Sequence, residues 1–218
     1  MALWLLILIP ILAAPLAWMG QQWSRHAPRW IVLGALALDF ILALLLGGQH
    51  STVQSSGHGA WLVESHTSWL PRWGISLHLG LDGLSVVLIL LTVFVGIVAT
   101  IASWTDIQSR VGLFHCHVLL ALGGVIGVFL AIDLFLFFFF WELMLIPMYL
   151  LIVIWGHAQR RHASFKFFLF TQAGSLVLLV AIVALALLHQ QATGRPSFDY
   201  ADLMGLTLTS EMARWLML

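Results

Sequence analysis

Residues 131–156 read AIDLFLFFFFWELMLIPMYLLIVIWG, and this stretch decides the fold. It ends a longer apolar run, 111–156, which as one helix would be about 69 Å long, more than twice the bilayer core of about 30 Å. The run must therefore fold back as a hairpin. Asp133 lies in the middle of the run, so we expect the turn at 131–133, with Asp133 as a turn or N-cap residue at the membrane surface.

The composition places the whole chain in a membrane. Of its 218 residues 61% are hydrophobic and only 8% are charged, whereas soluble domains carry roughly 25% charged residues. We therefore expect an all-α, polytopic transmembrane helical bundle. The formal net charge is zero, which gives no electrostatic reason to expect nucleic acid. The single cysteine, Cys116, excludes an internal disulfide.

Six apolar runs have the length of a membrane span, and we expect one membrane domain over 1–218. The first run is interpreted as a retained helix, because a signal peptide needs a basic n-region and no charged residue precedes Arg25. A seventh run begins near Ala213 and is cut off at Leu218. The predicted spans are 3–19, 30–47, 84–104, 112–131, 134–155 and 165–188.

The loop charges predict the orientation. Of the nine Lys and Arg residues, six lie in loops one, three and five and three in loops two, four and six. Cationic loops stay in the cytoplasm, so the N-terminus should be periplasmic. Loop two, 48–79, contains Trp61, Trp69 and Trp73, which suit the membrane interface.

Glu142 is the strongest functional signal in the sequence. It lies near the middle of its span, about 12 Å along the helix from residue 134. Insertion scales put the cost of a central charge at about 2.5–3.5 kcal/mol, and such residues typically mark ion pathways. A carboxyl group in this position can take up and release a proton, as a relay requires. The alternative is a structural glutamate, hydrogen-bonded between helices.

Two further residues are candidates for the same polar site. Pro147 has no N–H, and its ring clashes with the carbonyl of Leu143. A kink there would free a polar backbone group beside Glu142, although an ordinary proline kink without chemistry also fits. Asp39 is a second acid in the middle of a span, either a polar relay or a structural hydrogen-bonding group.

The other polar motifs predict capping rather than chemistry. Asp82 and Ser85 open the third span as good N-cap residues. His115 and His117 point about 200° apart on a helix and cannot share a metal there. No nucleotide loop, CxxC motif or haem motif is present. We therefore expect no metal and no cofactor bound by this chain. The remaining histidines of loop two lack a ligand-spaced acid or cysteine: His50, His58 and His66.

The stretch GGVIGVFLAIDLFLFFFFWELMLIPMYLLIVIWGH, residues 123–157, resembles the chain M family of antiporter-like membrane subunits. These belong to bacterial proton-translocating NADH–quinone oxidoreductase, respiratory complex I. Further resemblance lies in PRWGISLHLGLDGLS (71–85), in KFFLFTQAGSLVLL (166–179) and in the N-terminal LILIP. The likeness covers essentially the whole chain.

The resemblance implies a fold of about fourteen helices, built as two inverted five-helix repeats that each carry a broken helix. It implies that Glu142 is the acid on the fifth helix, whose partner is a lysine on the seventh. Other membrane-arm subunits and lipid would be the partners, in the bacterial inner membrane. FMN, iron–sulfur clusters and quinone would belong to other subunits of the complex.

The chain departs from the family pattern in two respects. Asp39 is not part of that pattern, and the sequence stops before the partner lysine and the second repeat. Two other interpretations therefore stay open. A subunit of a cation/proton antiporter or membrane-bound hydrogenase would share the fold and the glutamate. A truncated product would be an inert membrane element.

Overall fold

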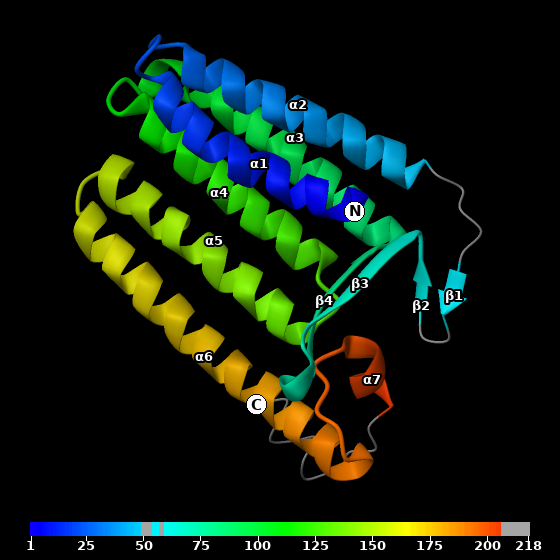
Figure 1. Cartoon of the computed structure of the whole chain (residues 1–218). Coiled ribbons are helices and arrows are strands. Elements are labelled where there is room, and N and C mark those ends of the chain that lie inside the picture. Colours follow the sequence, from blue (N-terminus) through cyan, green and yellow to red (C-terminus); the bar gives the residue numbers. More distant parts are fainter. Residues whose placement is uncertain (49–53, 57–58, 206–218) are drawn as a thin grey trace.

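The computed structural model describes residues 1–48, 54–56 and 59–205. Within them, six long apolar helices run alternately in opposite directions (Figure 1). They match the predicted spans to within a few residues at each end and confirm a polytopic helical membrane fold. The expected seventh span from Ala213 lies outside the described residues. The six helices are α1 (Ala2–Gly20), α2 (Ala27–Gly47), α3 (Gly83–Asp106), α4 (Val111–Leu130), α5 (Leu134–Trp155) and α6 (Arg160–Thr193).

The predicted turn between α4 and α5 is confirmed. Asp133 is the N-cap of α5, and its Oδ1 accepts hydrogen bonds from the N–H groups of Phe135 at 2.9 Å and Leu136 at 3.0 Å. Its Oδ2 accepts from the N–H and the hydroxyl of Ser76 at 2.8 and 3.1 Å. Asp133 is fully buried. The turn is therefore stabilised by a carboxylate that accepts hydrogen bonds at both oxygens and is covered by other parts of the chain.

Loop two contains β-structure that the sequence analysis did not foresee. Strands β1 (Gln54–Ser56) and β2 (Gly59–Trp61) pair with each other. Strands β3 (Val63–Leu70) and β4 (Ile75–Leu81) form a longer antiparallel hairpin, joined by the 3₁₀ turn η1 (Pro71–Trp73). Strand β4 is mostly buried and β3 mostly exposed. The hairpin therefore caps one end of the helical bundle (Figure 1). His50 and His58 lie outside the described residues.

The α6–α7 connection closes over the same end of the bundle. The short helix α7 (Tyr200–Met204) is capped by Asp199, whose Oδ1 accepts from the Ala201 N–H at 2.9 Å. Asp199 also forms an isolated antiparallel bridge with Asp133. Gly74 has a φ of 69°, in the left-handed region that glycine adopts without strain. A Cβ at Gly74 would meet the backbone of Pro196, so the hairpin turn and the α6–α7 connection are in close contact.

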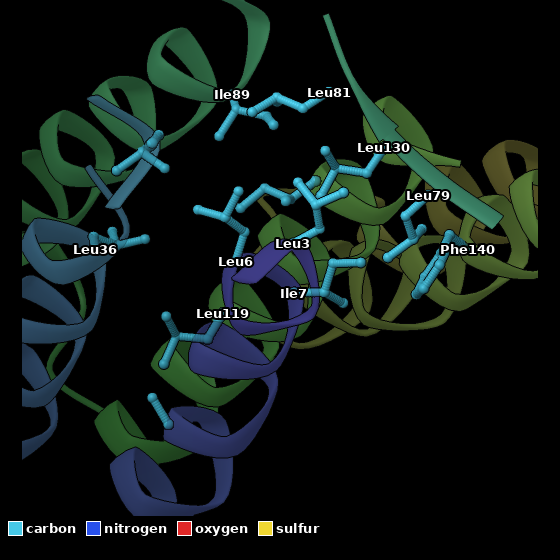
Figure 2. Packing of buried hydrophobic residues seen from close by; sticks show 14 of the residues in the cluster. Leu3, Leu6, Ile7, Leu36, Leu79, Leu81, Ile89, Leu119, Leu130 and Phe140 are labelled. Atoms are coloured by element: carbon cyan, nitrogen blue, oxygen red, sulfur yellow. The ribbon is translucent and has the colours of Figure 1, made fainter. Parts of the chain in front are cut away.

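The apolar core lies among α1–α5 and is sealed at one end by β4. Figure 2 shows Leu3, Leu6 and Ile7 of α1 at its centre, and all three are at most 1% exposed. Side chains from the surrounding elements pack around them: Leu36, Leu79, Leu81, Ile89, Leu119, Leu130 and Phe140. Large apolar side chains that remain exposed on the helices suit lipid or further helices.

Helix α4 lies at the centre because glycines let its neighbours approach. A Cβ added at Gly123 would come within 2.8 Å of Ile11 on α1. Added at Gly124 it would come within 2.8 Å of Met144 on α5, and at Gly127 it would meet the ring of Phe140. Small residues at helix interfaces allow this close packing in membranes. Helix α4 is accordingly the most buried of the six spans, since half of the residues in its most apolar stretch are buried inside the protein.

Candidate functional site

Glu142 lies on the ninth residue of α5, and its Oε1 is buried without a hydrogen-bond partner among the described residues. Phe140 and Met144 are the α5 residues that meet the glycines of α4. Glu142 is two positions from each, which at 3.6 residues per turn turns its side chain to the opposite side of the helix. The carboxyl group therefore faces away from α4.

The side of α5 that carries Glu142 packs on α6. Phe138, four residues before Glu142, packs against an apolar cluster that includes Ile182 and Ala186 of α6. Tyr149, seven residues after it, contacts the ring of Phe168 with centroids 5.4 Å apart. Residues separated by four and seven positions share one helix face. Glu142 is therefore bracketed by two contacts with α6 and lies in the α5–α6 interface.

A buried hydroxyl of α6 lies near the level of Glu142. Because α5 and α6 are antiparallel, the contacts at Phe138 and Tyr149 put Glu142 level with residues 175–178 of α6, and Ser175 is at the start of that range. Ser175 is only 3% exposed, and its hydroxyl donates to the carbonyl of Gln172 at 3.1 Å. The side chain of Gln172 donates back to Ser175 Oγ at 3.4 Å. These polar side chains were not predicted from the sequence as part of the site, although TQAGS at 171–175 interrupts an apolar span.

Asp39 lies in a different interface. It is on the buried face of α2 with Val32, Leu36 and Ala43, and it is completely buried. Neither carboxylate oxygen has a hydrogen-bond partner among the residues that the structure describes. A buried polar group without a partner is costly, so the described fold offers no structural reason for an acid at this position.

The two acids lie at the same depth. A Cβ at Gly96 of α3 would come within 3.2 Å of Leu36 and 2.7 Å of Leu122, so these two leucines are level. Helices α2 and α4 run in the same direction (Figure 1), which puts Asp39, three residues beyond Leu36, level with residue 125 of α4. On the other side, the pairs Gly124–Met144 and Gly127–Phe140 put Glu142 level with residues 125–126. The structure does not bring the two acids into contact, because α4 and α5 separate them.

Pro147 lies inside the continuous helix α5 and is buried. It is seven residues from Phe140 and therefore on the side that faces α4. Glu142 and Pro147 thus point to opposite sides of α5. The missing N–H of Pro147 leaves the Leu143 carbonyl without its helical partner.

Arg29 forms a buried polar cluster nearer to the start of α2. It is 1% exposed, and its guanidinium lies over the Trp104 ring at 5.0 Å. Nη2 donates to the Ile107 carbonyl at 3.1 Å, and Nη1 donates to His26 Nδ1 at 3.1 Å. From the sequence alone, Arg29 is only one of the cations of loop one. It lies ten residues before Asp39, about 15 Å along the same helix.

His115 and His117 are each held by their own helix. His115 Nδ1–H donates to the Val111 carbonyl at 2.8 Å, and His117 Nδ1–H donates to the Leu113 carbonyl at 2.7 Å. The Nε2 of His115 is buried without a hydrogen-bond partner among the described residues. These bonds fix each ring against the preceding turn of α4.

Three titratable groups outside the spans are paired, in contrast to the two acids: Glu64, His78 and Asp199. His78 on β4 contacts Asp199 through Nδ1, and its Nε2 donates to Glu64 Oε1 at 2.7 Å. Burial lowers the pKa of His78, but the hydrogen bonds and charges of Asp199 and Glu64 outweigh burial and raise it overall. Burial raises the pKa of Asp199, but the hydrogen bonds from His78 and the Ala201 N–H outweigh burial and lower it overall.

A protein-family model and individual known proteins show the same family resemblance. Residues 131–218 match the family model described as NADH:quinone oxidoreductase/Mrp antiporter, TM. NADH-quinone oxidoreductase subunit M of Escherichia coli strain K12 is 46% identical over 220 residues, which covers 98% of this chain and 43% of that protein. The subunit M of Pseudomonas aeruginosa is 46% identical over 222 residues, with the same two shares.

A solved structure has the same fold. A chain of respiratory complex I from Thermus thermophilus with bound NADH superposes with a TM-score of 0.79 at 30% identity, over 99% of this chain and 41% of that chain. The chain thus spans about two fifths of the length of the relatives that it matches.

Proposed function

Because the chain belongs to the antiporter-like membrane subunits of NADH:quinone oxidoreductase, we propose that it forms part of a proton-translocating half-channel. Proton movement there would be coupled to NADH oxidation and quinone reduction. The redox chemistry, with FMN, iron–sulfur clusters and quinone, belongs to other subunits. The partners of this chain are other membrane-arm subunits and lipid. In this proposal 1–218 is one part of a single membrane domain in the bacterial inner membrane, with a periplasmic N-terminus.

Glu142 carries this proposal. Its Oε1 is buried at mid-span without a hydrogen-bond partner among the described residues, and intramembrane acids of this kind mark proton relays. Its carboxyl group lies in the α5–α6 interface, within about one helical turn of the level of the buried Ser175 hydroxyl. A hydroxyl both donates and accepts hydrogen bonds. The Ser175 hydroxyl is therefore suited to hydrogen-bond with the Glu142 carboxyl group whether that group is protonated or ionised. We assign Glu142 as the proton-relay residue.

Asp39 and Pro147 have lesser roles in the proposal. Asp39 is assigned as a second polar relay group, because both of its oxygens are buried and unpartnered within the described residues and it lies at the depth of Glu142. Pro147 supports the site through the helix, since the Leu143 carbonyl that it frees can bind water or a polar side chain.

The test is proton uptake by membrane vesicles energised with NADH, with Glu142→Gln placed in the complete subunit of the assembled enzyme. The amide cannot exchange a proton, so we expect NADH-driven uptake to fall several-fold. Glu142→Asp keeps a carboxyl group and should preserve part of the uptake. Uptake in Glu142→Gln equal to that of the parent enzyme, at equal enzyme content, would remove the relay role.

A further inference from the structure

Three potential metal ligands, two from the β3–β4 hairpin and one from the α6–α7 connection, meet at the end of the bundle that β4 covers. His66 on β3 and His78 on β4 are directly paired by the strand register, and their rings are 4.8 Å apart in an edge-on contact. Asp199 is brought to them by the α6–α7 connection. One ligand atom from each of the three residues lies within 4.8 Å of the other two. An ion among them therefore needs only small side-chain movements to reach all three.

The orientation of His78 is the one that metal-binding histidines usually have. A ligating histidine almost always donates its other ring N–H to a carboxylate or a carbonyl, which fixes the ring and its tautomer. The Nε2 of His78 donates to Glu64 Oε1 at 2.7 Å, and its Nδ1 is directed at Asp199, so a bound ion would replace the proton on Nδ1 and release it to solvent. His78 is buried and cannot turn freely, so its Nδ1 is fixed toward the cluster.

The cluster is open to solvent on one side. His66 is exposed, and both His66 and Asp199 line a cavity of about 360 Å³. The carboxylates of Glu64 and Asp199 flank His78, so the site carries the negative charge that a cation needs. A hydrated ion thus has a route to the ligands and a charge that attracts it there.

We propose that His66, His78 and Asp199 bind a divalent transition-metal ion of the Zn²⁺ class, with Glu64 as the positioning residue of His78. Two imidazoles and one carboxylate are a ligand set that Zn²⁺ accepts, and a fourth position facing the cavity remains for water. The ion would tie β3 and β4 to the α6–α7 connection. Sequence spacing predicted no metal set because His66 and His78 meet only through strand register, and Asp199 reaches them from the distant α6–α7 connection.

The test is Zn²⁺ binding to the purified, metal-free full chain in detergent, followed by competition with a chromophoric chelator. We expect one tightly bound Zn²⁺ per chain. His66→Asn should weaken its binding at least about tenfold, and because His66 is exposed, this variant is expected to fold. Glu64→Gln should weaken it by about 10- to 100-fold. His162→Asn, which changes an exposed histidine of α6 outside the cluster, is the matched control and should bind as the parent does.

A second measurement separates a metal site from a purely structural ion cluster. With Zn²⁺ present, the melting temperature of the parent chain and of His162→Asn should rise, and that of His66→Asn should not. Co²⁺ in place of Zn²⁺ should give the visible absorption of a four-coordinate centre. Equal Zn²⁺ affinity in the parent, His66→Asn and Asp199→Asn would overturn the proposal, as would the absence of stoichiometric binding to the parent chain.

Discussion

Asp133 and Asp39 are both completely buried aspartates, yet their surroundings are opposite. Asp133 accepts four hydrogen bonds, from Phe135, Leu136 and both donors of Ser76. Asp39 accepts none from the residues that the structure describes. Burial of an acid is tolerated when its oxygens are hydrogen-bonded and is costly otherwise. Asp133 thus builds the fold, whereas the fold supplies nothing that explains Asp39.

Glu142 belongs with Asp39 in this comparison. The capping acids lie at helix ends, where backbone N–H groups are free to donate. Asp39 and Glu142 lie in mid-helix, where those groups are already used by the helix itself. The position along a helix therefore separates acids that stabilise this protein from acids that are candidates for proton transfer. Substitution of an acid at a helix end should therefore lower stability, whereas substitution of a mid-helix acid should leave stability nearly unchanged.

The largest loss of stability is expected from Asp133→Ala. The change removes the cap of α5 and leaves the buried N–H and hydroxyl of Ser76 without an acceptor, which should cost about 2–4 kcal/mol of unfolding free energy. Asp82→Ala is the matched control, since Asp82 accepts one cap bond, from the Ser85 N–H at 2.7 Å, and its loss should cost about 1 kcal/mol. Thermal unfolding in detergent measures both, and equal losses would contradict the ranking.

The next effect tests the packing of α4 between the two acids. In Gly127→Ala the new methyl group would meet the ring of Phe140, so α4 and α5 should separate slightly at a cost of about 1–3 kcal/mol. Gly34→Ala is the control, because a Cβ there meets nothing within 4 Å. It should be neutral or stabilise α2 by up to about 1 kcal/mol. Gly127→Ala as stable as Gly34→Ala would show that the glycines of α4 are not needed for close packing.

The smallest stability effect is expected at the unpartnered acids. Asp39→Asn and Glu142→Gln keep the size of each side chain, and Asp39 has no described hydrogen bond to lose. Each should change the unfolding free energy by less than about 1 kcal/mol. Thermal unfolding beside Asp133→Ala provides the comparison. A loss in Asp39→Asn comparable to that in Asp133→Ala would mean that Asp39 has a structural partner after all.

The sequence predicted the elements well because bilayer thickness constrains them. Span length and the position of Asp133 were enough to locate the α4–α5 turn. The β3–β4 hairpin was missed because the loop as a whole is rich in Ser and Gly, although ISLHLGL (75–81) alternates apolar with polar or small residues as a strand does. The pairing of His66 with His78 follows from strand register, which spacing along the chain does not reveal.

The site residues also differ in whether the sequence alone identifies them. Glu142 and Asp39 could be identified because a charge in an apolar span needs no structural context to be conspicuous. The partner surface of Glu142 could not, since its direction toward α6 depends on which face of α5 meets that helix. Likewise Arg29 reads as a loop charge until Trp104, 75 positions away, is placed against it.

The most direct test of the role of Glu142 is the number of protons taken up per NADH oxidised in the assembled enzyme. The ratio should be measured in vesicles for the parent, Glu142→Gln and Asp82→Asn, with NADH oxidation recorded in the same samples. We predict that the ratio falls in Glu142→Gln and stays at the parent value in Asp82→Asn, where the changed residue lies at a helix end. An unchanged ratio in Glu142→Gln, with the enzyme intact, would contradict the assignment of Glu142 as a proton-relay residue.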